Sequence, residues 1–161
     1  MSQFPFVAVL DNIRSLHNVG SIFRTADAAG VGKLYLCGMT GTPPRQEIRK
    51  AALGAEETVP WEYFKQTGKA LAQLKQAGYF LLALENISTS IDYRRAAYQF
   101  PLALVVGHEY NGITPEILAQ CDGAISLPMR GLKVSLNVAV AFGVASYEIA
   151  NQLVDETNSN L

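Results

Sequence analysis

The chain has 161 residues, which fits one domain with a core large enough to be stable without disulfides or metals. Its residues are 49% hydrophobic and 17% charged, a composition that excludes a disordered or fibrous protein. The formal net charge of −1 excludes a protein that coats nucleic acid through bulk positive charge, although a local basic face stays open.

Apolar runs and helical periodicity alternate along the chain. In chain order they predict a strand at 6–10, a helix at 19–29, a strand at 33–37, a loop at 39–50, a helix at 63–77, strands at 79–84 and 102–107, a short helix at 114–119, a strand at 124–128 and a helix at 137–153. The strands at 79–84 and 102–107 are almost continuously apolar, which is typical of a parallel sheet with helices on both faces. The predicted class is therefore α/β.

Glycines and caps mark the helix ends. Gly30 and Gly78 follow two of the helices and favour left-handed C-terminal caps. The last helix is apolar on too wide an arc for a surface helix, so we expect it either at the centre of the domain or at a subunit interface. We assign one domain to residues 1–154 and expect the polar tail, 155–161, to be frayed.

The N-terminal segment and the cysteines exclude several classes of protein. The apolar run at the start lacks a basic leader and is broken by Pro5, so we expect no signal peptide and no membrane span, and hence a cytoplasmic protein. Cys37 and Cys121 form no Cys-x-x-Cys pattern, and His17 and His108 are the only histidines. We therefore predict neither a disulfide nor a structural metal.

The first candidate motif, residues 17–26, opens the first predicted helix directly after a strand. Asn18 can cap the helix, and Gly20 lets another backbone or a ligand approach closely. Arg24 lies six residues further on and reaches the same end only if its side chain extends back toward the N-terminus. A capping asparagine with an unrelated surface arginine is the plainer alternative.

The second motif, residues 107–115, lies at the carboxyl end of a strong strand. Ligands of open α/β sheets bind beyond such strand ends, so Gly107 and Glu109 are well placed for a nucleoside. An Asn-Gly turn with a solvated glutamate is the alternative.

The third motif, residues 127–138, connects a strand to the last helix. Ser135 and Asn137 are candidate caps, and their side chains could also meet a phosphate at the helix N-terminus. A purely capping role for at least one of them stays open.

Together and in this order, the three segments resemble motifs one to three of the SpoU branch of the SPOUT methyltransferases: N-x-G-x-x-x-R-T-A, G-x-E-x-x-G and P-M-x-G-x-x-x-S-L-N-V. The resemblance covers residues 9–148. It implies a parallel sheet flanked by helices with a deep C-terminal trefoil knot, a rare exception to the rule against knots. It also implies an S-adenosylmethionine-dependent RNA ribose 2'-O-methyltransferase that works as a homodimer without a metal.

The resemblance also assigns residues to the site. It implies a cofactor pocket in the knot, lined by Leu84, Gly107, Leu127, Met129 and Leu136, with core packing as the alternative for Leu84 and Leu136. It implies a catalytic group made of Asn18, Arg24, Glu109, Ser135 and Asn137. Because guanidinium resists deprotonation, we expect Arg24 to orient the ribose and stabilise a developing alkoxide rather than to act as a base.

The chain should recognise structured RNA without a separate RNA-binding domain. The basic residues cluster at Arg45, Arg49 and Lys50 in the loop at 39–50, and at Arg130 and Lys133 in the third motif. We expect these side chains to contact phosphates. By resemblance to short relatives, tRNA is favoured over rRNA.

Two rival functions are weighed beside this one. A catalytically inactive RNA-binding module of the same fold is disfavoured by the intact motifs. A flavodoxin-like or Rossmann-type nucleotide-binding enzyme is disfavoured because neither G-x-G-x-x-G nor a P-loop opens the first helix.

Overall fold

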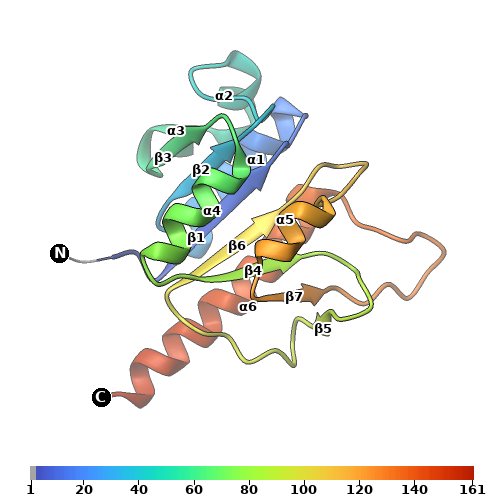
Figure 1. Ribbon diagram of the computed structural model, residues 1–161. Coiled ribbons are helices and arrows are strands. Elements are labelled where there is room, and N and C mark those ends of the chain that lie inside the picture. The colour runs from blue at the N-terminus through green and yellow to red at the C-terminus, as the bar shows by residue number, and fades with distance from the viewer. Residues whose placement is uncertain (1–2) are drawn as a thin grey trace.

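The computed structural model describes residues 3–161 and contains a seven-stranded parallel sheet with helices on both faces (Figure 1). The strand order is β3-β2-β1-β6-β4-β7-β5. The strands are β1 (Phe6–Asp11), β2 (Leu34–Cys37), β3 (Trp61–Phe64), β4 (Phe80–Leu84), β5 (Ile91–Asp92), β6 (Leu102–Val106) and β7 (Gly123–Ser126). The helices are α1 (Leu16–Ala29), α2 (Gln46–Ala52), α3 (Ala55–Thr58), α4 (Thr67–Gln76), α5 (Pro115–Gln120) and α6 (Val138–Ser159). The predicted fold class is confirmed.

Two cores, one on each face, explain the continuous apolar strands. In β1, Phe6, Ala8 and Leu10 pack into the core under α1, α2, α3 and α6. Val7 and Val9, which point the other way, join the core under α4 and α5. Alternate side chains of a strand point to opposite faces, so a sheet covered twice needs apolar residues at every position.

The prediction of a helix over 63–77 is wrong at its start. Residues 61–64 form β3, which pairs with β2 in the register Leu34↔Trp61, and α4 begins at Thr67. Pairing with a distant strand decided the structure of these half-exposed residues, and a local pattern does not report that pairing. The two-residue strand β5 was missed for the same reason.

The start of α1 also differs from the prediction. The helix begins three residues earlier, and Ser15 caps it by accepting a hydrogen bond from the Asn18 backbone N–H at 3.1 Å. Asn18 is therefore not the cap, and its side chain is free for other partners. The predicted left-handed end of the helix is confirmed, because Gly30 has φ of 83°.

Residues 39–50 are not a loop throughout. Helix α2 begins at Gln46 and packs on α1 where Gly20 lies. A Cβ at Gly20 would come within 2.5 Å of the Ile48 carbonyl oxygen, so the close approach expected of this glycine is made by α2. Only Ile48 and Ala52 of α2 are buried, which is too few apolar positions to predict a helix from the sequence.

Helix α6 is longer than predicted and includes most of the tail expected to be frayed. It continues to Ser159, because a helix once formed extends at little cost through residues that tolerate it. One face buries Phe142, Ala145 and Ile149 against the core. The opposite face leaves an apolar stripe exposed: Val140, Val144, Tyr147 and Val154.

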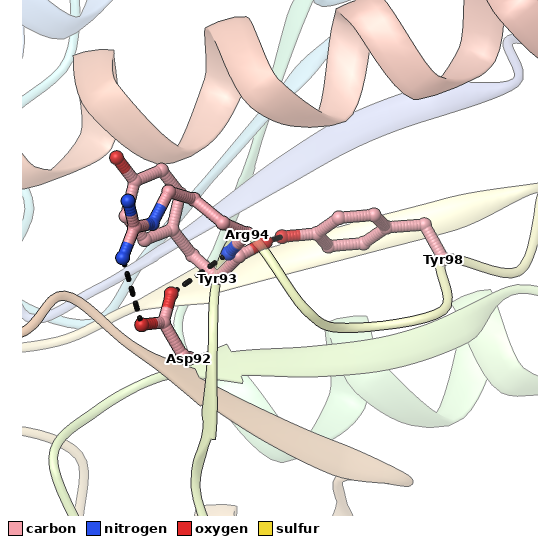
Figure 2. A network of polar contacts seen from close by, with 4 residues as sticks. All are labelled: Asp92, Tyr93, Arg94 and Tyr98. Atoms are coloured by element: carbon pink, nitrogen blue, oxygen red, sulfur yellow. Dashed lines mark hydrogen bonds and ion pairs between the residues drawn. The ribbon is translucent and has the colours of Figure 1, made fainter.

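The segment between β4 and β6 carries β5 to the edge of the sheet, beyond β7. Strand β7 lies between β4 and β5, although β4 and β5 are consecutive along the chain. Within this segment, the Tyr98 hydroxyl donates to the Tyr93 carbonyl, and the Arg94 guanidinium lies 3.4 Å from the Asp92 carboxylate (Figure 2). Tyr93 and Tyr98 also pack on the core that α6 covers.

Across residues 3–161, no helix is both long enough and apolar enough to cross a membrane.

Candidate functional site

A cavity of about 160 Å³ lies beyond the carboxyl ends of β4, β6 and β7. The five residues that the sequence assigned to a cofactor all line it: Leu84, Gly107, Leu127, Met129 and Leu136. Leu84 is only half-buried and Leu136 is 44% exposed, so neither is simply a core residue. The chain thus brings together, from three separated segments, the residues that the resemblance assigned to the cofactor pocket.

The turn after β6 forms one wall of the cavity. A Cβ at Gly107 would lie 2.7 Å from the Ile113 backbone N, so only glycine allows the chain to fold back this closely. The His108 Nδ1 accepts hydrogen bonds from the backbone N–H groups of Tyr110 and Asn111 at 3.0 and 3.1 Å. The turn is therefore held by its own residues and presents backbone groups at the cavity.

Glu109 joins the second motif to the first. Its carboxylate accepts hydrogen bonds from the backbone N–H groups of Arg14 and Ser15 at 3.1 and 3.0 Å, and from Asn18 Nδ2 at 3.2 Å. Burial raises the pKa of Glu109, but these hydrogen bonds outweigh burial and leave the pKa below its ordinary value. Glu109 is therefore an ionised anchor at the N-terminus of α1 and not the solvated glutamate of the alternative reading.

Asn18 and Asn137 join the first motif to the third. Asn137 Nδ2 donates to Asn18 Oδ1 at 3.3 Å. Asn137 Oδ1 also caps α6 by accepting from the Ala139 N–H at 2.9 Å, so the capping role foreseen for this residue is confirmed. Since Asn18 also donates to Glu109, one chain of hydrogen bonds runs through all three motifs.

The other two residues of the predicted catalytic group, Ser135 and Arg24, are outside this chain of hydrogen bonds and lie apart from each other. Ser135 lines the cavity and its side chain is exposed. Arg24 is exposed on α1 about 9 Å along the helix axis from Asn18 and does not line the cavity. Its neighbour Thr25 faces α6, where a Cβ on Gly143 would lie 3.6 Å from the Thr25 methyl group. A single chain therefore does not bring Arg24 to the cavity in this conformation.

The predicted RNA-contacting residues fall into two groups. Arg130 and Lys133 are exposed in the segment that lines the cavity. Arg45, Arg49 and Lys50 are exposed on or next to α2, which packs on α1. Glu56 and Glu57, which the sequence places outside the basic cluster, share a surface groove with Arg49 and Lys50. The basic face around α2 is therefore less positive than the sequence suggested.

Sequence reasoning missed one charged residue of the cavity, Glu85. It follows β4 directly and lines the cavity beside Leu84. Its position at the carboxyl end of a parallel strand was the signal available, but no motif contains it.

The chemistry of the lining suits a nucleoside carrying a positive charge. Apolar side chains from three segments supply packing area, the turn after β6 supplies backbone polar groups, and Glu85 and Glu109 are the only acidic side chains in the lining described for residues 3–161. Burial raises the pKa of Cys37 and Cys121 to about 12, so neither thiol is a nucleophile at neutral pH.

The profile of the SpoU rRNA methylase family matches residues 5–147, and the chain belongs to that family. The TrmH family protein YacO of Bacillus subtilis is 36% identical over 153 residues, which cover 92% of this chain and 59% of YacO. The 23S rRNA (guanosine-2'-O-)-methyltransferase RlmB of Ralstonia nicotianae is 34% identical over 148 residues, with 92% and 59% covered. The chain thus spans somewhat more than half the length of these curated relatives.

Solved structures agree with this assignment. The TrmH/SpoU tRNA modifying enzyme of A. aeolicus superposes with a TM-score of 0.86 at 32% identity, covering 96% of this chain and 78% of that one. The AdoMet-bound rRNA methyltransferase of Sinorhizobium meliloti gives 0.88 at 30% identity, covering 94% and 58%. The trefoil knot predicted from the sequence is implied by this fold.

Proposed function

We propose that this chain is an S-adenosylmethionine-dependent methyltransferase that modifies a ribose 2'-OH of RNA. The observation that carries the proposal is the junction of the three motifs through Glu109, Asn18 and Asn137 at the edge of the cavity. The relative RlmB, named as a guanosine-2'-O-methyltransferase, supports the sugar hydroxyl as target.

The cavity residues fit the proposed cofactor. When bound, S-adenosylmethionine supplies a methyl group made electrophilic by its sulfonium. Leu84, Leu127, Met129 and Leu136 would pack around the adenine, and backbone groups of the turn that starts at Gly107 would bind its polar edge. The AdoMet-bound enzyme of Sinorhizobium meliloti supports this use of the fold. Methyl transfer of this kind needs no metal, and we expect none.

Arg24 would act across a subunit interface. Because a guanidinium group is a poor base and a good hydrogen-bond donor, the role of Arg24 would be to orient the ribose and the adjacent phosphate and to stabilise the alkoxide as it develops. Because Arg24 lies outside the cavity of its own chain, we assign it to the cavity of a partner in a homodimer. The exposed stripe on α6 supports such a dimer, since a second copy would bury it.

The substrate would be structured RNA, and we favour tRNA over rRNA. Arg130 and Lys133 are exposed beside the cavity, where they can contact phosphates around the target ribose. The similarity to the tRNA modifying enzyme of A. aeolicus supports tRNA. Phosphate contacts by Arg45, Arg49 and Lys50 would be secondary, because Glu56 and Glu57 lie in the same groove.

The decisive experiment on the substrate is mass spectrometry of RNA nucleosides from a strain lacking the gene. We expect one 2'-O-methylated nucleoside to be lost from the tRNA fraction and restored by the wild-type gene. Unchanged nucleosides, together with purified protein that binds RNA but not S-adenosylmethionine in calorimetry, would establish the alternative of an inactive RNA-binding module.

A further inference from the structure

The position of Glu85 at the cavity is fixed by hydrogen bonds that do not depend on its negative charge. Its backbone N–H donates to the Ile125 carbonyl at 3.0 Å, and its carbonyl accepts from the Ser90 hydroxyl. Its side-chain Oε2 accepts from the Ile113 N–H at 2.8 Å. A glutamine could make that last contact equally well, so the backbone geometry does not explain why a carboxylate is present.

The chain also leaves room for this carboxylate. Gly112 has φ of 64°, and a Cβ there would lie 2.4 Å from Glu85 Oε2. The turn after β6 therefore passes directly against the carboxylate and fixes its position in the cavity wall.

The charge of Glu85 is only partly compensated. Glu109, the other carboxylate of the lining, accepts three hydrogen bonds from the start of α1. Glu85 Oε1, by contrast, accepts only a long contact from the Asn86 N–H at 3.3 Å. Over residues 3–161, the lining of the cavity includes no lysine or arginine. The cavity therefore carries the negative charge of Glu85, a half-buried residue of its lining.

Methyl transfer changes the charge of the cofactor. The bond between sulfur and the methyl carbon breaks as the bond from the ribose oxygen to that carbon forms, and the hydroxyl proton leaves to solvent. The sulfonium of S-adenosylmethionine thereby becomes the neutral thioether of S-adenosylhomocysteine. A fixed negative charge stabilises the first species more than the second.

We propose that Glu85 makes the cavity select the cationic methyl donor over its neutral product. The inference rests on the proposed use of S-adenosylmethionine. Glu85 acts here as a specificity residue for the cofactor and takes no part in activating the ribose.

The test is calorimetric binding of S-adenosylmethionine and of S-adenosylhomocysteine to the wild type and to Glu85→Gln. The glutamine keeps an acceptor for the Ile113 N–H and removes the charge; the only hydrogen bond it loses is the long contact from the Asn86 N–H. We expect donor affinity to fall about five- to tenfold and product affinity to change by less than about twofold. Glu156→Gln, at an exposed position near the end of α6, is the matched control and should change neither.

Three outcomes would overturn the proposal. An equal loss for both ligands would mean that Glu85 contacts a group that both share, such as a hydroxyl or the ammonium. No change in affinity for either ligand would mean that the charge of Glu85 does not stabilise the sulfonium. A fall in product affinity alone would mean that Glu85 favours the product over the donor.

The thermal unfolding midpoint, and separate measurement of KM and kcat, distinguish this role of Glu85 from a purely structural one. Glu85→Gln should unfold close to the wild-type temperature, whereas Glu85→Ala, which loses the bond to Ile113, should unfold lower and bind both ligands more weakly. In Glu85→Gln, KM for the donor should rise and kcat should not fall, because the carboxylate stabilises the sulfonium of the bound donor at least as much as the transition state, in which part of that charge is already lost. The proposed function fails separately, if the wild type prefers the donor but methylates no RNA.

Discussion

Asn137 combines two tasks that one substitution can separate. Its Oδ1 caps α6, and its Nδ2 reaches Asn18 at 3.3 Å. Asn137→Ala should lower the free energy of unfolding by about 1 kcal/mol through loss of the cap. Asn137→Ser keeps a capping oxygen, so it should unfold within about 0.5 kcal/mol of the wild type in urea and still transfer methyl groups more slowly. A serine variant with full activity would show that the contact with Asn18 is dispensable.

Glu109 gives the fold a pH dependence of known sign. Its pKa in the folded protein is below the ordinary value, so the folded state binds fewer protons and the stabilisation is present above the unfolded pKa, about 4.3. It disappears as the pH falls through the lower, folded pKa. The measurement is the difference in unfolding free energy between wild type and Glu109→Gln from pH 7 to pH 3.

We expect that difference to be constant from pH 7 to about pH 5 and to shrink below it. The comparison cancels the opposite effect of Asp11, whose pKa burial raises. A difference that grew on acidification would contradict the assignment of Glu109 as an ionised anchor.

At the scale of elements, the sequence predicts the strands and helices that have a clear local pattern and misses the strands that depend on pairing with distant segments. The five strands predicted from apolar runs are present, because each is covered on both faces. Strands β3 and β5, at the two edges of the sheet, depend on partners far along the chain. Helix α2 buries too little to leave a periodic pattern, and the polar end of α6 is helical only because the helix continues into it.

The candidate site, too, could be predicted from the sequence only in part. The motif residues could be grouped from the sequence because spacing and residue type together carried the resemblance. Glu85 could not, since an acidic residue after a strand is common and only the fold brings it against Gly112 and Ile113. The role of Asn18 also needed the fold, because Ser15 takes the cap that Asn18 was expected to supply.

The packing of α1 on α2 is tested at Gly20. Gly20→Ala would place a methyl group 2.5 Å from the Ile48 carbonyl oxygen, a backbone atom that cannot move without shifting α2. We expect a loss of about 1–3 kcal/mol in chemical unfolding. Gly143→Ala on α6 is the control, because its Cβ would meet Thr25 at an ordinary 3.6 Å and alanine favours helix. Equal stabilities of the two variants would refute the close approach.

At the scale of the whole molecule, we expect a monomer to suffice for cofactor binding, whereas methyl transfer should need the dimer. One chain contains the whole cavity, but Arg24 lies outside it. Val144→Asp puts a charge in the exposed stripe of α6 and should give a monomer in sedimentation at micromolar concentration. That monomer should still bind S-adenosylmethionine within a few-fold of the wild type, yet methylate RNA at least about 100-fold more slowly.

Gln73→Asp, exposed on α4 on the opposite face of the sheet, controls for added charge and should leave a dimer of full activity. A wild-type protein that is monomeric at micromolar concentration, or a monomeric variant of full activity, would contradict the shared site.

The most direct test asks which atom of the RNA receives the methyl group. Purified protein is incubated with S-adenosylmethionine labelled in the methyl group and with bulk tRNA, and the product is digested with alkali. A methyl on the ribose oxygen removes the hydroxyl that alkali needs, so the account predicts label in an alkali-resistant dinucleotide. Label recovered in mononucleotides, as methylated bases would give, contradicts it.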